Sequence, residues 1–346
     1  MSPLPELTII SVYHNWISKR LLETNAALVR RLNPDVRYTW LAANNTPRDF
    51  PHALKGDFFV VRNDEKYLGL GSHHHASGIN LCLPHVTTRF FASLDSDFMI
   101  VRPQWMKEAL DHMQNNKLAF FGVTYFPKDM PKYRYFPCVV FMIIDLKRVP
   151  LATIDFMPRY NMDAFGHAEL AYKKQPREER NREEKIIHAL PRGLRDFLNR
   201  LRRTFGFGYR RKFIGAARDT SYAIYERYHN TPLKRDNVTP VFDYAHDPQI
   251  AELVFVRINR IIERFLPDSL RYIPGKLGAY TSAGFREMGY FDCRALGWEE
   301  YVWKGKPFAT HIHGLKTAKR GRTDEEEVKN VQRAIDELVN AHVRST

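Results

Sequence analysis

The stretch RFFASLDSDFMIV, residues 89–101, carries a hydrophobic run directly into two aspartates, Asp95 and Asp97. Burying an ionised carboxylate is costly unless that carboxylate is paired or binds a cation. Residues i and i+2 of an extended chain point to the same side, so both carboxylates can be directed at one point beyond a strand's end. A D-x-D on its own is also typical of a turn or a helix cap. With a cation between them, hard oxygen ligands of this kind select Mg²⁺ or Mn²⁺.

The sequence before these aspartates alternates apolar runs with helical patterns. A β-rich run at Leu7–Tyr13 precedes a helical apolar periodicity at Trp16–Leu32. Further strands are expected at residues 38–43, 57–61, 118–126 and 138–145, and a helix begins after Gly71. Near-continuous apolar strands alternating with helices are typical of a parallel sheet covered on both faces. Open sheets of this class bind ligands at the carboxyl ends of their strands, which is where Asp95 and Asp97 fall.

Composition sets the broad class of protein. The chain has 346 residues, of which 44% are hydrophobic and 27% charged, as in ordinary soluble globular proteins. Its longest apolar runs, such as CVVFMII, are too short to span a bilayer. Three separated cysteines form neither a disulfide framework nor a zinc pattern, so we expect a cytoplasmic protein without a signal peptide. The net charge of +14 favours an anionic substrate, a membrane surface or a polyanion without choosing among them.

Much of that charge lies in residues 185–212, which carry nine Lys and Arg residues against one acidic residue, Asp196. Apolar residues recur there at steps of three and four, which predicts a basic amphipathic helix. Three interpretations stay open. The helix contacts an anionic membrane surface, packs as an ordinary helix with a solvated face, or binds nucleic acid, which is the least favoured.

A resemblance to a known family follows from these motifs. The N-terminal strand, the helix with Gly71 and residues 78–80 (GIN), and the stretch ASLDSDFMIVRP resemble the nucleotide-sugar-dependent glycosyltransferases of GT-A fold. The resemblance covers about the first 150 residues and a short C-terminal motif. It implies that Asp95 and Asp97 bind a metal and the donor's diphosphate. The C-terminal motif ATHIHGLK is similar to a family element that supplies a histidine as third metal ligand, which implies His311 or His313. In that element Lys316 would contact the diphosphate.

A general base is expected if the reaction inverts the anomeric centre, and inversion and retention both stay open. The stretch ARDTSYAIY resembles a D-[TQ]-G element placed near the acceptor, which nominates Asp219, with Ser221 in place of the glycine. A helix N-cap is the alternative interpretation of Asp219. Glu299 and Glu300, upstream of the histidine motif, are the rival bases.

Donor contacts in this fold usually come from the ends of the first strands, which nominates Ser11, Tyr13 and Asn44. Lys66 and the helix after Gly71 are expected to approach the phosphates, since helix N-termini favour anions. The run HHH at 73–75 is not expected to bind one ion, because consecutive helical residues point about 100° apart. One of these histidines could face the donor pocket, and a surface or core role is expected for the rest.

Together these observations predict an α/β protein of GT-A type, Rossmann-like with a mostly parallel central sheet. We expect a nucleotide-sugar half at 1–158, a basic helical insertion at 159–217, an acceptor-side half at 218–320 and a C-terminal helix at 321–346. The predicted activity is metal-dependent transfer of a hexose-type sugar from a nucleotide diphosphate sugar, with a UDP-sugar favoured and Mn²⁺ or Mg²⁺ as cofactor. The expected acceptor is a glycan or glycolipid in polysaccharide biosynthesis at the inner membrane face.

Three other hypotheses compete with this one. A nucleotidyltransferase also combines a Rossmann-like half with Mg²⁺ on carboxylates, but it normally shows a Gly-rich basic loop after the first strand, where this chain has SVYHNW. A basic nucleic-acid-binding protein without catalysis would leave the aspartates without a role. A transferase fold that has become a partner-binding scaffold is the third alternative.

Overall fold

The computed structural model describes residues 6–48, 50, 53–63, 71–124, 136–158, 220–229, 231–241, 281, 283–312 and 324–344. These residues form one ten-stranded sheet with helices packed against it. The strands are β1 (Leu7–Tyr13), β2 (Tyr38–Asn44), β3 (Phe59–Arg62), β4 (Phe90–Leu94), β5 (Phe98–Ile100), β6 (Leu118–Val123), β7 (Phe141–Asp145), β8 (Lys234–Pro240), β9 (Glu299–Trp303) and β10 (Lys306–His311). The α-helices are α1 (Trp16–Leu32), α2 (Ser72–Cys82), α3 (Trp105–Asn116), α8 (Tyr222–Tyr228) and α10 (Asp324–Arg344).

The first strand and helix match the expected ranges. Every residue of β1 is buried, as expected for a strand covered on both faces. Helix α1 begins after Asn15, whose side-chain oxygen accepts from the Ser18 backbone N–H while the Ser18 hydroxyl accepts from the Asn15 N–H. This reciprocal capping satisfies backbone donors that the first turn would otherwise leave unpaired. Local sequence therefore determines both the strand and the start of the helix.

The predicted fold class, an α/β protein with a mostly parallel central sheet, is confirmed. The sheet order is β3-β2-β1-β4-β7-β6-β8-β9-β10-β5, and the neighbours from β3 to β4 pair in parallel. Strand β6 also pairs in parallel with β8. The remaining pairs, including β4 with β7 and β10 with both β9 and β5, are antiparallel. The parallel strands β3, β2, β1 and β4 form one end of the sheet, and the other strands extend it through antiparallel pairs and the parallel pair of β6 with β8.

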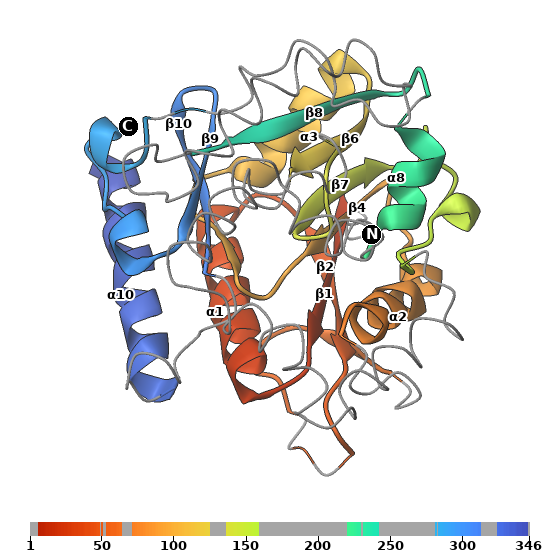
Figure 1. The fold of residues 1–346 in the computed structure, drawn as a ribbon, viewed down its shortest axis with the longest axis horizontal. Helices are drawn as coiled ribbons and strands as arrows, with labels where there is room; N and C mark the ends of the chain where they lie inside the picture. The colour runs from red at the N-terminus through yellow and green to blue at the C-terminus, as the bar shows by residue number, and fades with distance from the viewer. Residues whose placement is uncertain are drawn as a thin grey trace, which may run out of the picture.

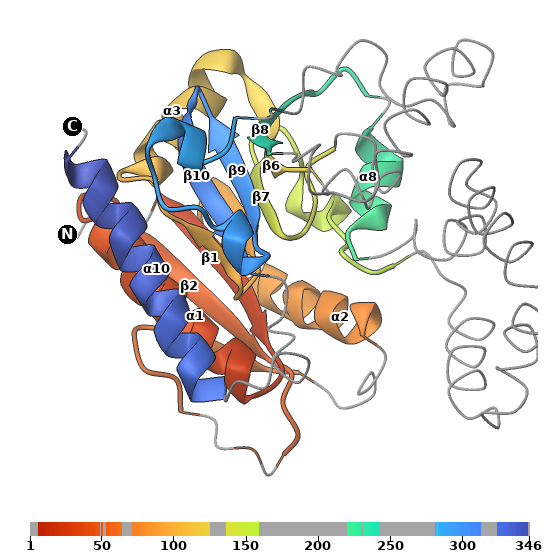
Figure 2. The same ribbon diagram turned by 60° about the vertical axis from the view of Figure 1, so that its left-hand side comes forward.

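Helices cover both faces of the parallel strands. Helices α1 and α10 lie side by side on one face, where Arg31 pairs with Asp336 at 2.8 Å, and α2 lies on the other face (Figures 1 and 2). The buried face of α10 includes Val331, Ile335 and Leu338. The predicted C-terminal helix is present, and its buried face packs against α1.

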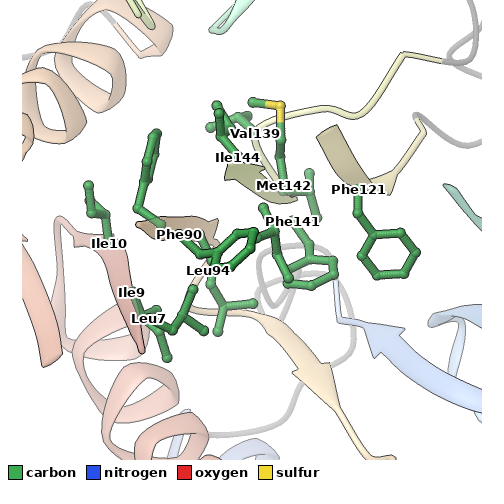
Figure 3. Close-up of a cluster of buried hydrophobic side chains, with 14 of the residues drawn as sticks. Leu7, Ile9, Ile10, Phe90, Leu94, Phe121, Val139, Phe141, Met142 and Ile144 are labelled. Carbon is green, nitrogen blue, oxygen red and sulfur yellow. The ribbon is translucent and has the colours of Figure 1, made fainter. Parts of the chain in front are cut away.

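Strand β4 lies inside the sheet, between β1 and β7, and all five of its residues are buried. Phe90 and Leu94 of β4 lie among Leu7, Ile9 and Ile10 of β1 and Phe141, Met142 and Ile144 of β7 (Figure 3). The hydrophobic run that precedes the two aspartates is thus part of the main core. Burying apolar area of this kind is the dominant favourable contribution to folding.

The predicted basic insertion, including residues 185–212, lies outside the described residues, as do residues 242–280. A hydrogen bond joins the segments that precede and follow the insertion, because the Ser221 N–H donates to the Phe156 carbonyl at 2.7 Å. The Thr220 hydroxyl donates to the Ser72 carbonyl at the start of α2 at 3.1 Å. Within the described residues, no helix is long and apolar enough to cross a membrane.

Ser221 occupies the position where the D-[TQ]-G element has glycine, and its backbone has a conformation that glycine adopts more readily than serine. Its φ is +70°, in the left-handed region, which costs an L-residue roughly 1–2 kcal/mol and costs glycine little. The side chain is buried, and its hydroxyl has no hydrogen-bond partner among the described residues. The position therefore favours glycine on two grounds.

We predict that Ser221→Gly raises the free energy of unfolding by about 1 kcal/mol, since it relieves the left-handed backbone and removes the buried hydroxyl. Ser221→Ala is the matched control, because it removes the hydroxyl and keeps the backbone cost, so it should stabilise less. Urea unfolding followed by circular dichroism measures both. A glycine variant less stable than the wild type would contradict the prediction.

Candidate metal and donor site

The two aspartates lie in the turn between β4 and β5. The Asp95 N–H donates to the Val140 carbonyl at 2.9 Å, and the Phe98 N–H donates to the Asp95 carbonyl at 3.1 Å. The Asn25 side chain on α1 donates to the Phe98 carbonyl at 2.9 Å. The turn is therefore held by one bond within itself and by bonds to Val140 and to α1, at the carboxyl end of β4, where the parallel strands end.

His311 comes to this turn through an antiparallel pair of strands. Strand β10 pairs with β5, so that His311 lies opposite Phe98. The pairing continues one residue further, where the Ile312 N–H donates to the Asp97 carbonyl at 3.0 Å. Backbone hydrogen bonds thus bring together residues that lie more than two hundred positions apart in the chain.

Asp95, Asp97 and His311 form one cluster of potential metal ligands. Their ligand atoms all lie within 4.8 Å of one another, and His311 Nε2 is 3.4 Å from Asp97 Oδ1. The side chains of Asp95 and Asp97 are 22% and 18% exposed, whereas that of His311 is 8% exposed. Two carboxylates and an imidazole suit Mn²⁺ and leave coordination positions on the exposed side. Mg²⁺ fits the carboxylates but gains less from the nitrogen.

His311 contacts a carboxylate with each of its ring nitrogens. Nδ1 lies 3.2 Å from Glu299 Oε2, on the side away from Asp97. Burial disfavours the charged imidazole, but the carboxylates of Asp97 and Glu299 outweigh burial and raise the pKa of His311 to about 10. Without a metal, a proton on His311 therefore offsets the negative charge of its neighbours. A cation would take over that role.

Two further histidines lie beside the aspartates; the sequence left open which member of the HHH run would face the site, and it did not nominate His14. His75 Nε2 is 3.4 Å from Asp95 Oδ1, so it is the member of the HHH run that faces the site. His14 follows β1 directly. Desolvation and the neighbouring His75 lower the pKa of His14, while Asp97 and Asp95 oppose that shift. His73 and His74 are buried, as a core role for most of the run predicts.

The residues predicted to contact the donor lie at or near the ends of β1 and β2. The Ser11 hydroxyl is buried, donates to the Leu94 carbonyl at 2.6 Å and accepts from Trp40 Nε1 at 3.1 Å. These contacts keep Ser11 in the core, away from the strand end. A donor contact by Ser11 stays a prediction without support from its surroundings.

Tyr13 and Asn44 lie at the strand ends themselves. Burial raises the pKa of Tyr13 to about 12, against the opposing effects of Arg62 and a hydrogen bond with Asn44. The Asn44 side chain also accepts from the Thr46 N–H at 3.0 Å. Arg62, at the end of β3, donates to the Thr46 carbonyl at 2.7 Å. The sequence missed this exposed guanidinium, although its place at a strand end was the available signal.

The two candidate bases on β9 lie in different surroundings. Glu300 is fully buried and accepts from the Phe285 and Cys293 N–H groups at 2.8 and 2.9 Å, with Arg294 at 3.4 Å. Burial raises its pKa to about 7 against these partners. Such contacts are those of a structural carboxylate, and they leave no access for an acceptor hydroxyl.

Glu299 is 6% exposed in its side chain and contacts His311. Its carboxylate lies on the Nδ1 side of His311, whereas the two partly exposed aspartates lie on the Nε2 side, so Glu299 is farther from solvent than the aspartates. A general-base role for Glu299 gains no support from that place. The other candidates, Lys66, Asp219, His313 and Lys316, lie outside the described residues, and their roles stay predictions.

No protein-family model and no curated protein sequence matches this chain. Among solved structures it is similar to a mannosyltransferase from Pyrobaculum calidifontis in complex with GDP-Man and Mn²⁺, at 12% identity and a TM-score of 0.30, over 43% of this chain and 48% of that one. The galactosyltransferase LgtC, in complex with donor and acceptor sugar analogues, matches at 14% identity and a TM-score of 0.31, over 42% and 62%. A protein described as a glucose-1-phosphate thymidylyltransferase from Bacillus anthracis matches at 10% and 0.28, over 41% and 72%.

Glycosyltransferases, the class that the sequence resembles, are thus among the solved structures similar to this chain, and a nucleotidyltransferase is among them too. The first two similarities span less than two thirds of the other chain. At TM-scores near 0.3 they assign no function, which has to be inferred from the residues of this chain.

We predict that the protein binds Mn²⁺ without any donor and that Asp97→Asn lowers the affinity at least about 100-fold. Losing a residue that merely supports a ligand already costs about 10–100-fold, and Asp97 is expected to be a ligand itself. Isothermal titration with MnCl₂ measures the change. Asp111→Asn, at an exposed aspartate on α3, is the control and should bind as the wild type does. Equal affinity of the Asp97 and Asp111 variants would exclude Asp97 as a ligand.

Proposed function

We propose that this chain is a metal-dependent glycosyltransferase that moves a sugar from a nucleotide diphosphate sugar to a glycan or glycolipid acceptor. The observation that carries the proposal is the meeting of Asp95, Asp97 and His311 at the carboxyl end of the parallel strands. A sheet of this kind binds ligands at that edge. The cluster is the kind of ligand set that a diphosphate-binding cation needs.

The chemistry follows from the leaving group. Breaking the bond between the sugar and a nucleoside diphosphate places negative charge on the departing phosphate oxygens. A divalent cation bound there supplies Lewis-acid stabilisation of that charge. Asp95 and Asp97 would hold the cation from the protein side, since their carboxylates are partly exposed and converge. His311 would fix its position, since the imidazole is buried and held by the backbone pairing.

The strand ends beside the cluster provide a place for the rest of the donor. Tyr13, Asn44 and Arg62 end the three neighbouring strands β1, β2 and β3. Arg62 is exposed, and its guanidinium is held by the Thr46 carbonyl and hydroxyl at 2.7 and 3.2 Å. A fixed cation with a planar set of donors suits phosphate or a nucleobase edge. We propose that these strand ends hold the nucleotide, with a UDP-sugar as the favoured donor.

On the acceptor side we propose Asp219 as the general base, because it directly precedes the tightly held Thr220 and Ser221. The basic residues 185–212 would bring the enzyme to an anionic membrane surface at the cytoplasmic face, where lipid-linked acceptors are built. Each Lys or Arg near such a surface contributes about 1 kcal/mol of attraction.

A thermal-shift panel tests the function directly. We expect one of UDP-, GDP-, CMP- or dTDP-sugars to raise the melting temperature when Mn²⁺ is present and to have little effect with EDTA. A ligand at 100 times its dissociation constant stabilises the folded state by about 2.7 kcal/mol, a shift that is easily measured. The same donor should show no metal-dependent shift with Asp97→Asn.

The panel also separates the proposal from its rivals. A shift with a nucleoside triphosphate, and release of pyrophosphate when a sugar 1-phosphate is added, would identify a nucleotidyltransferase instead. Absence of a shift with every nucleotide sugar would contradict the proposed activity. Once the donor is known, release of its nucleoside diphosphate on addition of glycan or glycolipid fractions identifies the acceptor.

Membrane contact makes a separate prediction. The full chain should sediment with vesicles containing phosphatidylglycerol at low salt and much less with pure phosphatidylcholine, because the attraction is electrostatic. Raising the salt concentration to about 0.5 M should release it. Reversing the charge of Arg200, Arg202 and Arg203 to glutamate should abolish sedimentation. Equal binding to neutral and anionic vesicles would contradict the electrostatic contact without touching the catalytic proposal.

A further inference from the structure

We infer that Glu299 is a positioning residue for the metal site. It would hold His311 in the one ring orientation and tautomer that present Nε2 to the cation. The inference rests on the metal site of the proposed function and assigns a role that differs from the general base expected for Glu299. It predicts that Glu299 affects metal binding even when no donor or acceptor is present.

The geometry of the two strands places the groups. Strands β9 and β10 pair antiparallel with Glu299 directly opposite His311. Glu299 Oε2 lies 3.2 Å from Nδ1, while Asp97 Oδ1 lies 3.4 Å from Nε2. A carboxylate at Nδ1 accepts a hydrogen bond, so it selects the tautomer that carries its proton there. Once a cation replaces the proton on Nε2, the lone pair of that nitrogen would face the cation beside Asp97.

Neighbouring groups hold Glu299 in turn. The Tyr301 hydroxyl donates to Glu299 Oε2 at 3.0 Å, and the Thr310 hydroxyl donates to the Glu299 carbonyl at 2.9 Å. The His311 ring also packs on Phe98, with 5.9 Å between ring centroids. These side chains are buried, so neither ring nor carboxylate is free to rotate at low cost. Partners of this kind orient the ligand and raise its basicity in metal sites.

Glu300 is a matched control in the next position of the chain. Successive residues of a strand point to opposite faces, so Glu300 lies on the other side of β9 from His311. It is also buried and carries the same carboxylate, but its partners are the Phe285 and Cys293 N–H groups and Arg294. Loss of its charge should affect stability and not the metal.

The experiment compares Glu299→Gln with Glu300→Gln in the full chain, with Mn²⁺ as the only ligand. Free Mn²⁺ measured by electron paramagnetic resonance gives the affinity, and the ¹⁴N modulation of bound Mn²⁺ reports the coordinated histidine. We expect Glu299→Gln to bind Mn²⁺ about 10–100-fold more weakly, with a changed or lost nitrogen signal. Glu300→Gln should retain wild-type affinity and signal even if its melting temperature falls.

Tyr301→Phe is the second variant, and it keeps the carboxylate and the ring packing on Phe98. It should weaken Mn²⁺ binding in the same direction as Glu299→Gln but by less, which would support the inference even if Glu299→Gln failed to fold. Wild-type affinity and nitrogen signal in both variants would overturn the positioning role and leave the proposed function standing. A wild-type protein that binds no Mn²⁺ would overturn both.

Discussion

The geometry of the site depends on how the chain compensates two carboxylates placed at the end of a buried strand. Two like charges about 4 Å apart repel by about 1 kcal/mol in water and about 4 kcal/mol at the effective dielectric of a protein surface. The chain places His75 beside Asp95 and His311 beside Asp97. The second of these contacts requires β10 to pair with β5, and the Ile312–Asp97 hydrogen bond extends that pairing to the turn itself. Long-range backbone pairing therefore sets the distance between the side chains on which the proposed chemistry depends.

Local sequence was sufficient for the parallel part of the fold. Strand β1 and helix α1 have the predicted bounds, because an apolar run followed by an i, i+3, i+4 pattern leaves little choice of structure. The antiparallel extension could not be predicted in the same way. Strand β5 has only three residues, and its partner β10 lies far along the chain. A pattern of three apolar residues has no period, and its pairing is decided by tertiary contacts rather than by propensity.

The candidate site was predicted to the extent that it follows from residue spacing and motif. The sequence nominated Asp95 and Asp97 as neighbours on an extended chain, whereas a hydrogen-bonded turn between β4 and β5 brings them together. The C-terminal motif nominated His311, which joins them in the cluster. His14 and Arg62 were missed, and the member of the HHH run that faces the site was left open, because these roles depend on how α2 and β3 pack beside β1. The HHH run shows what the helical period predicts and what only tertiary packing decides. The 100° step of a helix correctly implied that its members diverge, but only the packing of α2 decides that His75, and not His74, faces the aspartates.

Glu299 and Glu300 are adjacent in sequence, but the alternation of side chains along β9 puts them in different surroundings. Both were nominated for the same task, since both precede the histidine motif and both can act as a base. Because β9 alternates its faces, Glu299 contacts His311 and Glu300 contacts the loop that carries Phe285 and Cys293. A buried carboxylate needs donors wherever it lies, and the donors available on each side differ. On one face these are a histidine and a tyrosine next to the aspartates, and on the other they are backbone amides and an arginine. The chain thus uses one residue type twice on one strand, in contact with His311 and Tyr301 on one side and holding a loop on the other.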